Sequence, residues 1–179
     1  MHEIETKVLE IDVDNIEEKL RNLGAKKISD TLLTVDWLRS VGTKNGEDKW
    51  FLRVRSYNKE KVEVTWKAIS EHIGVSRKHK EINFEIEDHD KMVDLFCEIG
   101  LEKYAHQEKK RISWKLENTQ FDIDIYPCMI PFVEIESDSV ESIDDFIKKL
   151  NLENHETWND GERTLIENKY KLDWCDMKF

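Results

Sequence analysis

The sequence predicts an α+β protein whose antiparallel strands form a closed β-barrel, with a polar, charged interior and the helices packed outside. Three observations lead to this fold class. At least seven segments alternate apolar and charged residues, which is the period-two pattern of β-strands. A strand–helix–three-strand order occurs twice along the chain. Charged residues make up 37% of the sequence, against about 25% in a typical globular protein. The strict alternation indicates that part of this excess charge lines a polar interior.

The first half of the chain is expected to hold one helix between extended segments. A strand runs from the N-terminus to about Ile11, and a helix capped by Asp12 or Asp14 then ends at Gly24. The next segments are an extended run at 26–38, a loop at 40–48 and two alternating strands at 50–55 and 61–67.

The segment 68–80 contains Gly74 and ends in four basic residues. It is interpreted either as a solvated loop or as a flap over an anionic ligand. An alternating strand at 81–87 follows, and then a helix, capped by Asp88 or Asp90, that ends at Gly100. The remaining expected elements are strands at 109–116, 121–126 and 132–136, a helix near 141–150 and a last helix near 161–171.

The repeated order suggests one domain over residues 1–179, built from two βαβββ-like halves at about 1–67 and 81–136, with helices at the C-terminus. Two such halves related by a pseudo-twofold axis would close an antiparallel barrel. The apolar helix stripes need an apolar surface, which the strands' apolar faces supply, so the charged faces point inward. This arrangement inverts the small barrel with an apolar interior.

The inward charged side chains form two groups. The acidic group contains Glu3, Glu5, Glu85, Glu87, Asp122, Asp124, Glu134 and Glu136, and the basic group contains Lys7, Arg53, Arg55, Lys67, Lys109 and Arg111. Clustered carboxylates suit Mg²⁺ or Mn²⁺, and clustered Arg and Lys suit phosphate oxygens. A water-filled tunnel that binds a metal–triphosphate complex accounts for both groups. The alternative is a two-layer sheet whose charged face is simply solvated.

The bulk properties restrict the partners. A net charge of −11 disfavours a stable nucleic-acid partner or an anionic membrane. No stretch approaches about 18 apolar residues, so no membrane span is expected. Met1 leads directly into a strand pattern, and the three cysteines lack metal-site spacing. We therefore expect a cytoplasmic protein without a signal peptide. A homodimer is possible through aromatic residues such as Trp37, which we expect to be exposed.

Several strands together resemble a known family. Glu3-Ile4-Glu5-Thr6-Lys7 resembles the ExExK signature of the CYTH superfamily, also called triphosphate tunnel metalloenzymes. Further segments resemble that family's later strands in the same order: Leu52-Arg53-Val54-Arg55, Thr65-Trp66-Lys67, Lys109-Lys110-Arg111, Phe121-Asp122-Ile123-Asp124 and Phe132-Val133-Glu134-Ile135-Glu136. The resemblance covers nearly the whole chain, although the region from Trp158 to Lys171 is only loosely comparable.

The resemblance implies an eight-stranded tunnel and a role for each residue. Catalysis falls to Glu3, Glu5, Lys7 and Asp122, and the triphosphate is held by Lys7, Arg53, Arg55, Lys67, Lys109 and Arg111. One or two ions of Mg²⁺ or Mn²⁺ are held by Glu3, Glu5, Glu134 and Glu136, with Glu85 or Glu87 and with Asp122 or Asp124. Which acid of the strand 81–87 faces the metal is left open, because Glu81, Glu85 and Glu87 share one face.

The expected function is metal-dependent hydrolysis of a triphosphate: inorganic tripolyphosphate, a nucleoside triphosphate such as ATP, or thiamine triphosphate. The alternative is a class IV adenylyl cyclase that converts ATP to cyclic AMP and pyrophosphate. Both chemistries use the same metal–triphosphate geometry, so the tunnel residues do not distinguish them. A third possibility is a non-catalytic module that binds polyphosphate or nucleotide, but the survival of both ExE pairs argues against it.

Overall fold

The computed structural model describes residues 4–44, 47–68, 71–73, 76–78 and 80–179. Their strands are antiparallel in every registered pair except one, and helices accompany them, so the α+β class is confirmed. The chain divides into two compact units. Unit 1 comprises residues 1–32, 109–173 and 179, and unit 2 comprises residues 33–108 and 174–178. This division differs from the two predicted repeats, which stay a prediction.

Unit 1 holds two helices against one face of its strands, and two long strands are shared with unit 2. Its elements are β1 (Ile4–Val8), α1 (Val13–Asn22), the start of β2 (Lys26–Ser40), the end of β8 (Leu101–Leu116), β9 (Thr119–Ile125), β10 (Phe132–Ser137), α3 (Val140–Lys149), β11 (Thr157–Trp158), α4 (Glu162–Thr164) and the π-helix η1 (Leu165–Lys169).

Unit 2 contains the remaining strands and one long helix. Its elements are the rest of β2 and β8, β3 (Trp50–Tyr57), β4 (Lys61–Ala68), β5 (Glu71–Ile73), β6 (Ser76–Lys78), β7 (Glu81–Ile86), α2 (His89–Glu98) and β12 (Asp176–Met177).

Ten strands share one hydrogen-bonded sheet, in the order β11-β1-β10-β9-β8-β2-β3-β4-β7, with β12 beside β8. Hydrogen bonds among the described residues do not join the two end strands, so they do not close this sheet into the expected barrel. The number of strands also exceeds eight. β11 and β12 contain two residues each, too few to show an alternating pattern.

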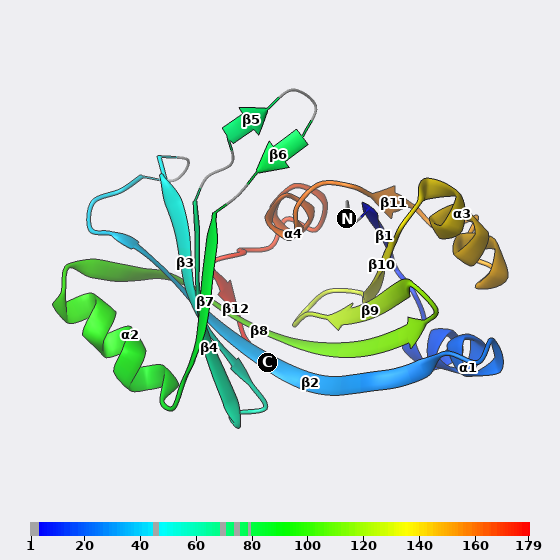
Figure 1. The fold of residues 1–179 in the computed structure, drawn as a ribbon, viewed down its shortest axis with the longest axis horizontal. Coiled ribbons are helices and arrows are strands. Elements are labelled where there is room, and N and C mark those ends of the chain that lie inside the picture. The colour runs from blue at the N-terminus through cyan, green and yellow to red at the C-terminus, as the bar shows by residue number, and fades with distance from the viewer. Residues whose placement is uncertain (1–3, 45–46, 69–70, 74–75, 79) are drawn as a thin grey trace. The chain divides into compact units, whose positions relative to one another are not determined.

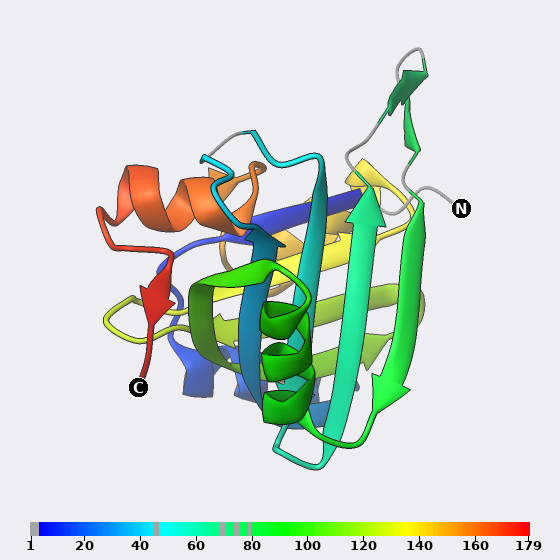
Figure 2. The same cartoon turned by 90° about the vertical axis from the view of Figure 1, so that its left-hand side faces the viewer.

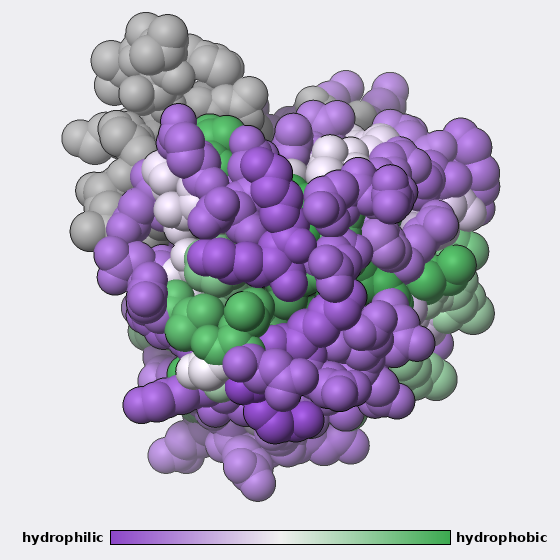
Figure 3. All heavy atoms as spheres, turned by 90° about the vertical axis from the view of Figure 1, so that its right-hand side faces the viewer, coloured by the Kyte–Doolittle hydropathy of each residue, from purple (hydrophilic) through white to green (hydrophobic). Residues whose placement is uncertain are grey.

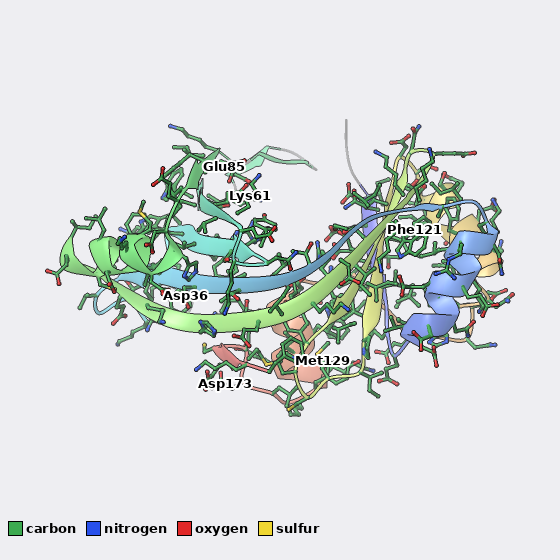
Figure 4. All side chains as sticks on the ribbon, turned by 90° about the horizontal axis from the view of Figure 1, so that it is seen from below. Asp36, Lys61, Glu85, Phe121, Met129 and Asp173 are labelled. Carbon is green, nitrogen blue, oxygen red and sulfur yellow. The ribbon has the colours of Figure 1, made fainter. Side chains whose placement is uncertain are left out.

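The apolar faces of the unit 1 strands form a core beneath α1 and α3 (Figure 1). Phe121 of β9 is fully buried, and its ring meets that of Phe146 edge-to-face at 5.0 Å. Figure 4 shows Phe121 between the strands and the helices. The side of the molecule on which α1 and α3 lie is mostly hydrophilic, crossed by a band of hydrophobic residues (Figure 3). Both helices are amphipathic, as their 3.6-residue spacing predicts, because α1 buries Ile16 and Leu20 and α3 buries Ile143 and Phe146.

The same arrangement recurs in unit 2. Val54, Val62 and Val64 form a core with Val93 of α2, which lies over β3 (Figure 2). Apart from β7, where Ile82 and Phe84 are exposed, apolar strand faces therefore pack under helices in both units, and the charged side chains occupy the opposite strand faces. This confirms the face assignment made from the period of two.

The helix boundaries follow local chemistry. Asp12 and Asp88 accept hydrogen bonds from the first turns of α1 and α2, which settles both open choices of cap. Gly24 and Gly100 follow the ends of these helices with φ of 86° and 99°, a conformation that glycine adopts without strain. None of the helices in the described part of the chain is long and apolar enough to cross a membrane.

Three element predictions need correction. The segment at 161–171 is not a regular helix, because three α-helical residues pass into the five-residue η1. The strand predicted at 109–116 starts at Leu101, since its first half carries mixed polar residues that hide the alternation. Part of the predicted loop 68–80 forms a hairpin of β5 and β6. His79, in the basic end of that segment, lies outside the described residues.

Trp37 does not offer the exposed aromatic surface on which the expected homodimer rests. Its ring is half-buried and lies 5.3 Å from that of Trp174, and its Nε1 donates to Gln107 Oε1 at 2.9 Å.

Candidate functional site: two charged strand faces

In unit 1 the strand register places acidic residues directly opposite one another on the charged face. Glu5 of β1 lies opposite Glu136 of β10, and Glu134 lies opposite Asp122 of β9. Like charges at directly opposed positions destabilise a sheet. This face therefore needs cations between its strands.

Lys7 supplies the first of these cations. Its side chain is only 3% exposed, and its Nζ lies 2.9 Å from Glu134 Oε2 and 3.4 Å from Glu5 Oε1. Burial lowers the pKa of Lys7, but Glu134 and Glu5 outweigh that effect, so the pKa lies above its usual value. For Glu134 the balance is reversed: burial raises its pKa, and Lys7 and Arg111 only partly oppose it. The neighbouring charge of Glu5 adds a smaller rise to the pKa of Glu134.

Arg111 supplies the second cation. Its Nε donates to Asp124 Oδ1 at 2.7 Å, its Nη2 donates to Asp124 Oδ2 at 2.5 Å, and its Nη1 donates to Asp122 Oδ2 at 2.9 Å. Asp124 is fully buried. Burial lowers the pKa of Arg111, yet Asp124 and Asp122 hold it well above its usual value. This bidentate pair fixes the guanidinium against the strands.

Lys109 supplies the third cation, and it brings in two residues that the sequence patterns missed. Its Nζ donates to Asp124 Oδ2 at 3.0 Å and to Glu162 Oε1 at 2.7 Å. The other carboxylate oxygen of Glu162 accepts from Tyr126 Oη at 2.5 Å. Burial raises the pKa of Glu162, but Lys109 and Arg111 lower it far more. Burial, with Glu162 and Asp124, holds the pKa of Tyr126 well above its usual value.

The period of two could have indicated Tyr126, because it continues the positions of Asp122 and Asp124. No such signal exists for Glu162, which follows Gly161 in a segment without alternation.

The unit 1 face retains an excess of negative charge and an unpaired acceptor. Three cations contact five carboxylates, so two negative charges remain in excess; the acids are Glu5, Asp122, Asp124, Glu134 and Glu162. Asp122 Oδ1 is buried without a hydrogen-bond partner in the described structure. Carboxylate oxygens of this kind are the donors that Mg²⁺ and Mn²⁺ prefer.

As they stand, these carboxylates point at lysine and arginine rather than at a common centre. Accordingly, no three His, Cys, Asp or Glu side chains of the described residues are placed to hold a metal ion together.

Unit 2 carries the other predicted cations on the charged face of β3 and β4. The guanidinium of Arg53 lies 5.6 Å from the centre of the Trp37 ring. Arg55 Nη1 donates to Tyr57 Oη at 3.1 Å, while Arg55 Nε is buried without a hydrogen-bond partner among the described residues. Lys67 Nζ lies 3.1 Å from Glu81 Oε2.

The acids of β7 contact cations within unit 2. Glu85 is 67% exposed and forms an ion pair with Lys61 on β4, and Figure 4 shows the two side chains close together. Glu87 lies exposed, just beyond the end of β7 at Ile86. Glu81 forms an ion pair with Lys67, which is one of the residues predicted to bind phosphate.

The structure thus brings the predicted site residues together in two sets, one in each unit. The unit 1 set contains Glu5, Lys7, Lys109, Arg111, Asp122, Asp124, Glu134 and Glu136, and the unit 2 set contains Arg53, Arg55, Lys67, Glu85 and Glu87. Glu3 lies outside the described residues.

These features define a class of protein: an α+β fold whose antiparallel strands bear interleaved carboxylates and cations on the face away from the helices. The chain belongs to the CYTH domain family, whose model matches residues 1–162.

Solved structures share this fold. A conserved hypothetical protein of Pyrococcus furiosus is 24% identical, with 92% of this chain and 100% of that chain covered and a TM-score of 0.69. A candidate adenylyl cyclase of Hippeastrum with a dominant triphosphatase activity is 13% identical, with 93% and 95% covered and a TM-score of 0.63. A candidate adenylate cyclase of Vibrio parahaemolyticus is 12% identical, with 99% and 92% covered and a TM-score of 0.59. At these identities the likeness concerns the fold alone. No curated protein matches the chain.

Proposed function

We propose that the protein is a metal-dependent enzyme that hydrolyses a triphosphate. The observation that carries this proposal is the charged face of unit 1, where cations and carboxylates alternate and one buried carboxylate oxygen, Asp122 Oδ1, has no hydrogen-bond partner among the described residues. A phosphate chain with a divalent cation needs both kinds of group within a few ångströms. The membership of the CYTH family and the triphosphatase activity of the Hippeastrum protein support the same reaction class.

The residues present fit a divalent cation. The opposed pairs Glu5–Glu136 and Glu134–Asp122 are unfavourable by themselves and would be stabilised by a positive ion. These four acids would hold Mg²⁺ or Mn²⁺, with Asp124 and Glu3 as further predicted ligands. Bound there, the ion would polarise the phosphoryl group and lower the pKa of a coordinated water.

The cations of the chain would bind and orient the phosphate oxygens. Arg111 offers a planar fork held in place by Asp124, and Lys7 offers a compact ammonium group between Glu5 and Glu134. In unit 2 the buried Nε–H of Arg55 has no hydrogen-bond partner among the described residues, so it could donate to an anionic ligand. Arg53, Lys67 and Lys109 complete the proposed phosphate ligands, which neutralise the charge that develops during phosphoryl transfer.

The proposed active form is a single domain in which the charged strand faces line a closed tunnel. This finer architecture rests on the resemblance to the family's strand order and on the excess of charge on the strand faces. Which acid of the segment 81–87 faces the metal stays open among Glu81, Glu85 and Glu87.

The decisive experiment is a substrate panel of tripolyphosphate, ATP, thiamine triphosphate and 5′-triphosphate RNA, each with Mg²⁺, with Mn²⁺ and with chelator. Products are resolved as phosphate, pyrophosphate and cyclic AMP. We expect phosphate release that requires the metal. Cyclic AMP with pyrophosphate from ATP would instead identify an adenylyl cyclase. Tight tripolyphosphate binding without turnover would identify a binding module.

Two variants test the metal ligands. Glu3→Ala and Glu136→Ala should each abolish metal-dependent turnover, whereas Asp176→Asn, which removes an exposed acid paired with Lys178, should not. Unchanged activity in both ligand variants would refute the metal assignment.

A further inference from the structure

Two of the three N–H donors of Lys109 are engaged by carboxylates in the arrangement seen here. An ammonium group has three N–H donors. One is used by Asp124 Oδ2 at 3.0 Å and one by Glu162 Oε1 at 2.7 Å, and the group also lies 5.1 Å from the centre of the Tyr126 ring. A phosphoryl group that takes two donors of Lys109 must therefore replace one of these carboxylates.

Glu162 is the partner whose contacts resemble those of a bound anion. Its Oε1 lies 2.7 Å from Lys109 Nζ and 3.6 Å from Arg111 Nη2, and its Oε2 accepts from Tyr126 Oη. Two cations and a hydroxyl around two oxygens form a set that a terminal phosphoryl group would also satisfy. Asp124 is less able to leave, because it is fully buried within β9 and held by Arg111 through two hydrogen bonds.

Glu162 is the first residue of a short helical segment. Its three-residue helix α4 passes directly into η1, and the carbonyl oxygen of Gly161 accepts hydrogen bonds from Leu165 N at 3.2 Å and from Thr164 Oγ1 at 2.7 Å. The firm attachment of this segment comes afterwards, where Leu165 and Ile166 are fully buried in η1. A rotation of the Glu162 side chain would release its carboxylate from Lys109 and Tyr126 while the buried residues of η1 stay in place.

We infer that Glu162 occupies an anion subsite on Lys109, Arg111 and Tyr126, and that a terminal phosphoryl group of the substrate displaces it. This inference rests on the proposed function for the identity of the anion. It makes Glu162 a specificity-determining residue, because only a ligand that competes with its carboxylate gains all three partners. An anion can bind this subsite only in molecules whose Glu162 carboxylate has left it. The apparent affinity for every anion is therefore reduced in proportion to the fraction of molecules in which the carboxylate occupies the subsite.

The test measures binding of tripolyphosphate by calorimetry in chelator, without metal, to the wild-type protein and to Glu162→Gln. The substitution keeps the shape of the side chain and removes its charge. We expect about tenfold tighter binding, within the usual range of coupling between two sites. Equal or weaker binding would overturn the inference, since a residue that merely positions Lys109 should weaken the site when its charge is lost.

Two further measurements make the result specific. Glu167→Gln removes an acid of the same segment that pairs only with Arg163 in the described contacts, and it should leave the affinity unchanged. Glu162→Ala, checked for a native circular dichroism spectrum, should also bind more tightly than wild type, and a loss of affinity there would count against the inference. Because no turnover is required, a protein that binds but does not hydrolyse would refute the proposed reaction and leave the subsite intact.

Discussion

Asp124 makes the strongest prediction about stability, because it is the one acid of the unit 1 face that binds two cations and is completely buried. It accepts two hydrogen bonds from Arg111 and one from Lys109. The change Asp124→Asn keeps the shape of the side chain but removes the charge. It also replaces one acceptor with an amide group that points N–H donors at cations.

The magnitude follows from what the two cations retain. Removing one partner of a buried ion pair costs about 3–5 kcal/mol. Lys109 keeps Glu162 and Arg111 keeps Asp122, so the loss should lie near the lower limit, about 3 kcal/mol. For a chain of this size that corresponds to a fall of about 6–12 °C in the unfolding temperature.

Urea and thermal unfolding followed by far-UV circular dichroism provide the assay. Asp176→Asn, which breaks an exposed ion pair with Lys178, is the matched control and should change the free energy of unfolding by less than about 0.5 kcal/mol. If Asp124→Asn unfolds at the same urea concentration as this control, the ion cluster does not stabilise the fold and the reasoning fails.

Three further predictions use the same measurements. Phe121→Ala should cost about 3–5 kcal/mol because the ring is fully buried, whereas Phe179→Ala, at a residue 65% exposed, should cost almost nothing; similar losses would contradict the core assignment. Asp36→Asn should cost about 1–3 kcal/mol, since Asp36 is 5% exposed and lies 2.6 Å from His106 Nδ1, and an unchanged urea midpoint would show that this contact is not stabilising. The folded-state pKa of Lys7 lies above its ordinary value of 10.5, because its two anions outweigh burial, so its charge stabilises the fold fully below pH 10.5 and ceases to do so as pH rises through the folded pKa. The difference in unfolding free energy between wild type and Lys7→Met should therefore be constant from neutral pH to about pH 10, where Glu134 and Glu5 are charged, and shrink above 10.5; a difference that stays constant to pH 12 would refute this.

Much of the fold could be predicted because strand alternation is a local property. The pair Asp122 and Asp124 against Phe121 and Ile123 shows which face meets the helices, and the structure confirms it. The helix caps at Asp12 and Asp88 could also be predicted from the sequence. An Asp directly before an amphipathic run is well placed to accept a hydrogen bond from a backbone N–H group of the first helical turn.

The partners within the charged face could not be predicted in this way. Contacts such as that of Lys109 with Glu162 join residues 53 positions apart and depend on a segment that has no periodic pattern. Likewise, Glu85 shares the predicted face, but its neighbour is decided by the register, which sets Lys61 within reach on β4. Sequence patterns define faces, whereas the ion pairs on a face also depend on side-chain length and conformation.

The strands β8, β9 and β10 use their odd and even positions for different purposes, and this limits how the protein can change. Inserting one residue into β9 would move Asp122 and Asp124 toward the helices and expose Phe121 and Ile123 on the charged face. Such a change would damage ligand binding and folding together. New substrate preferences can therefore arise by exchanging side chains at fixed positions, or in segments outside the strands such as the one carrying Glu162, but not by altering strand length by single residues.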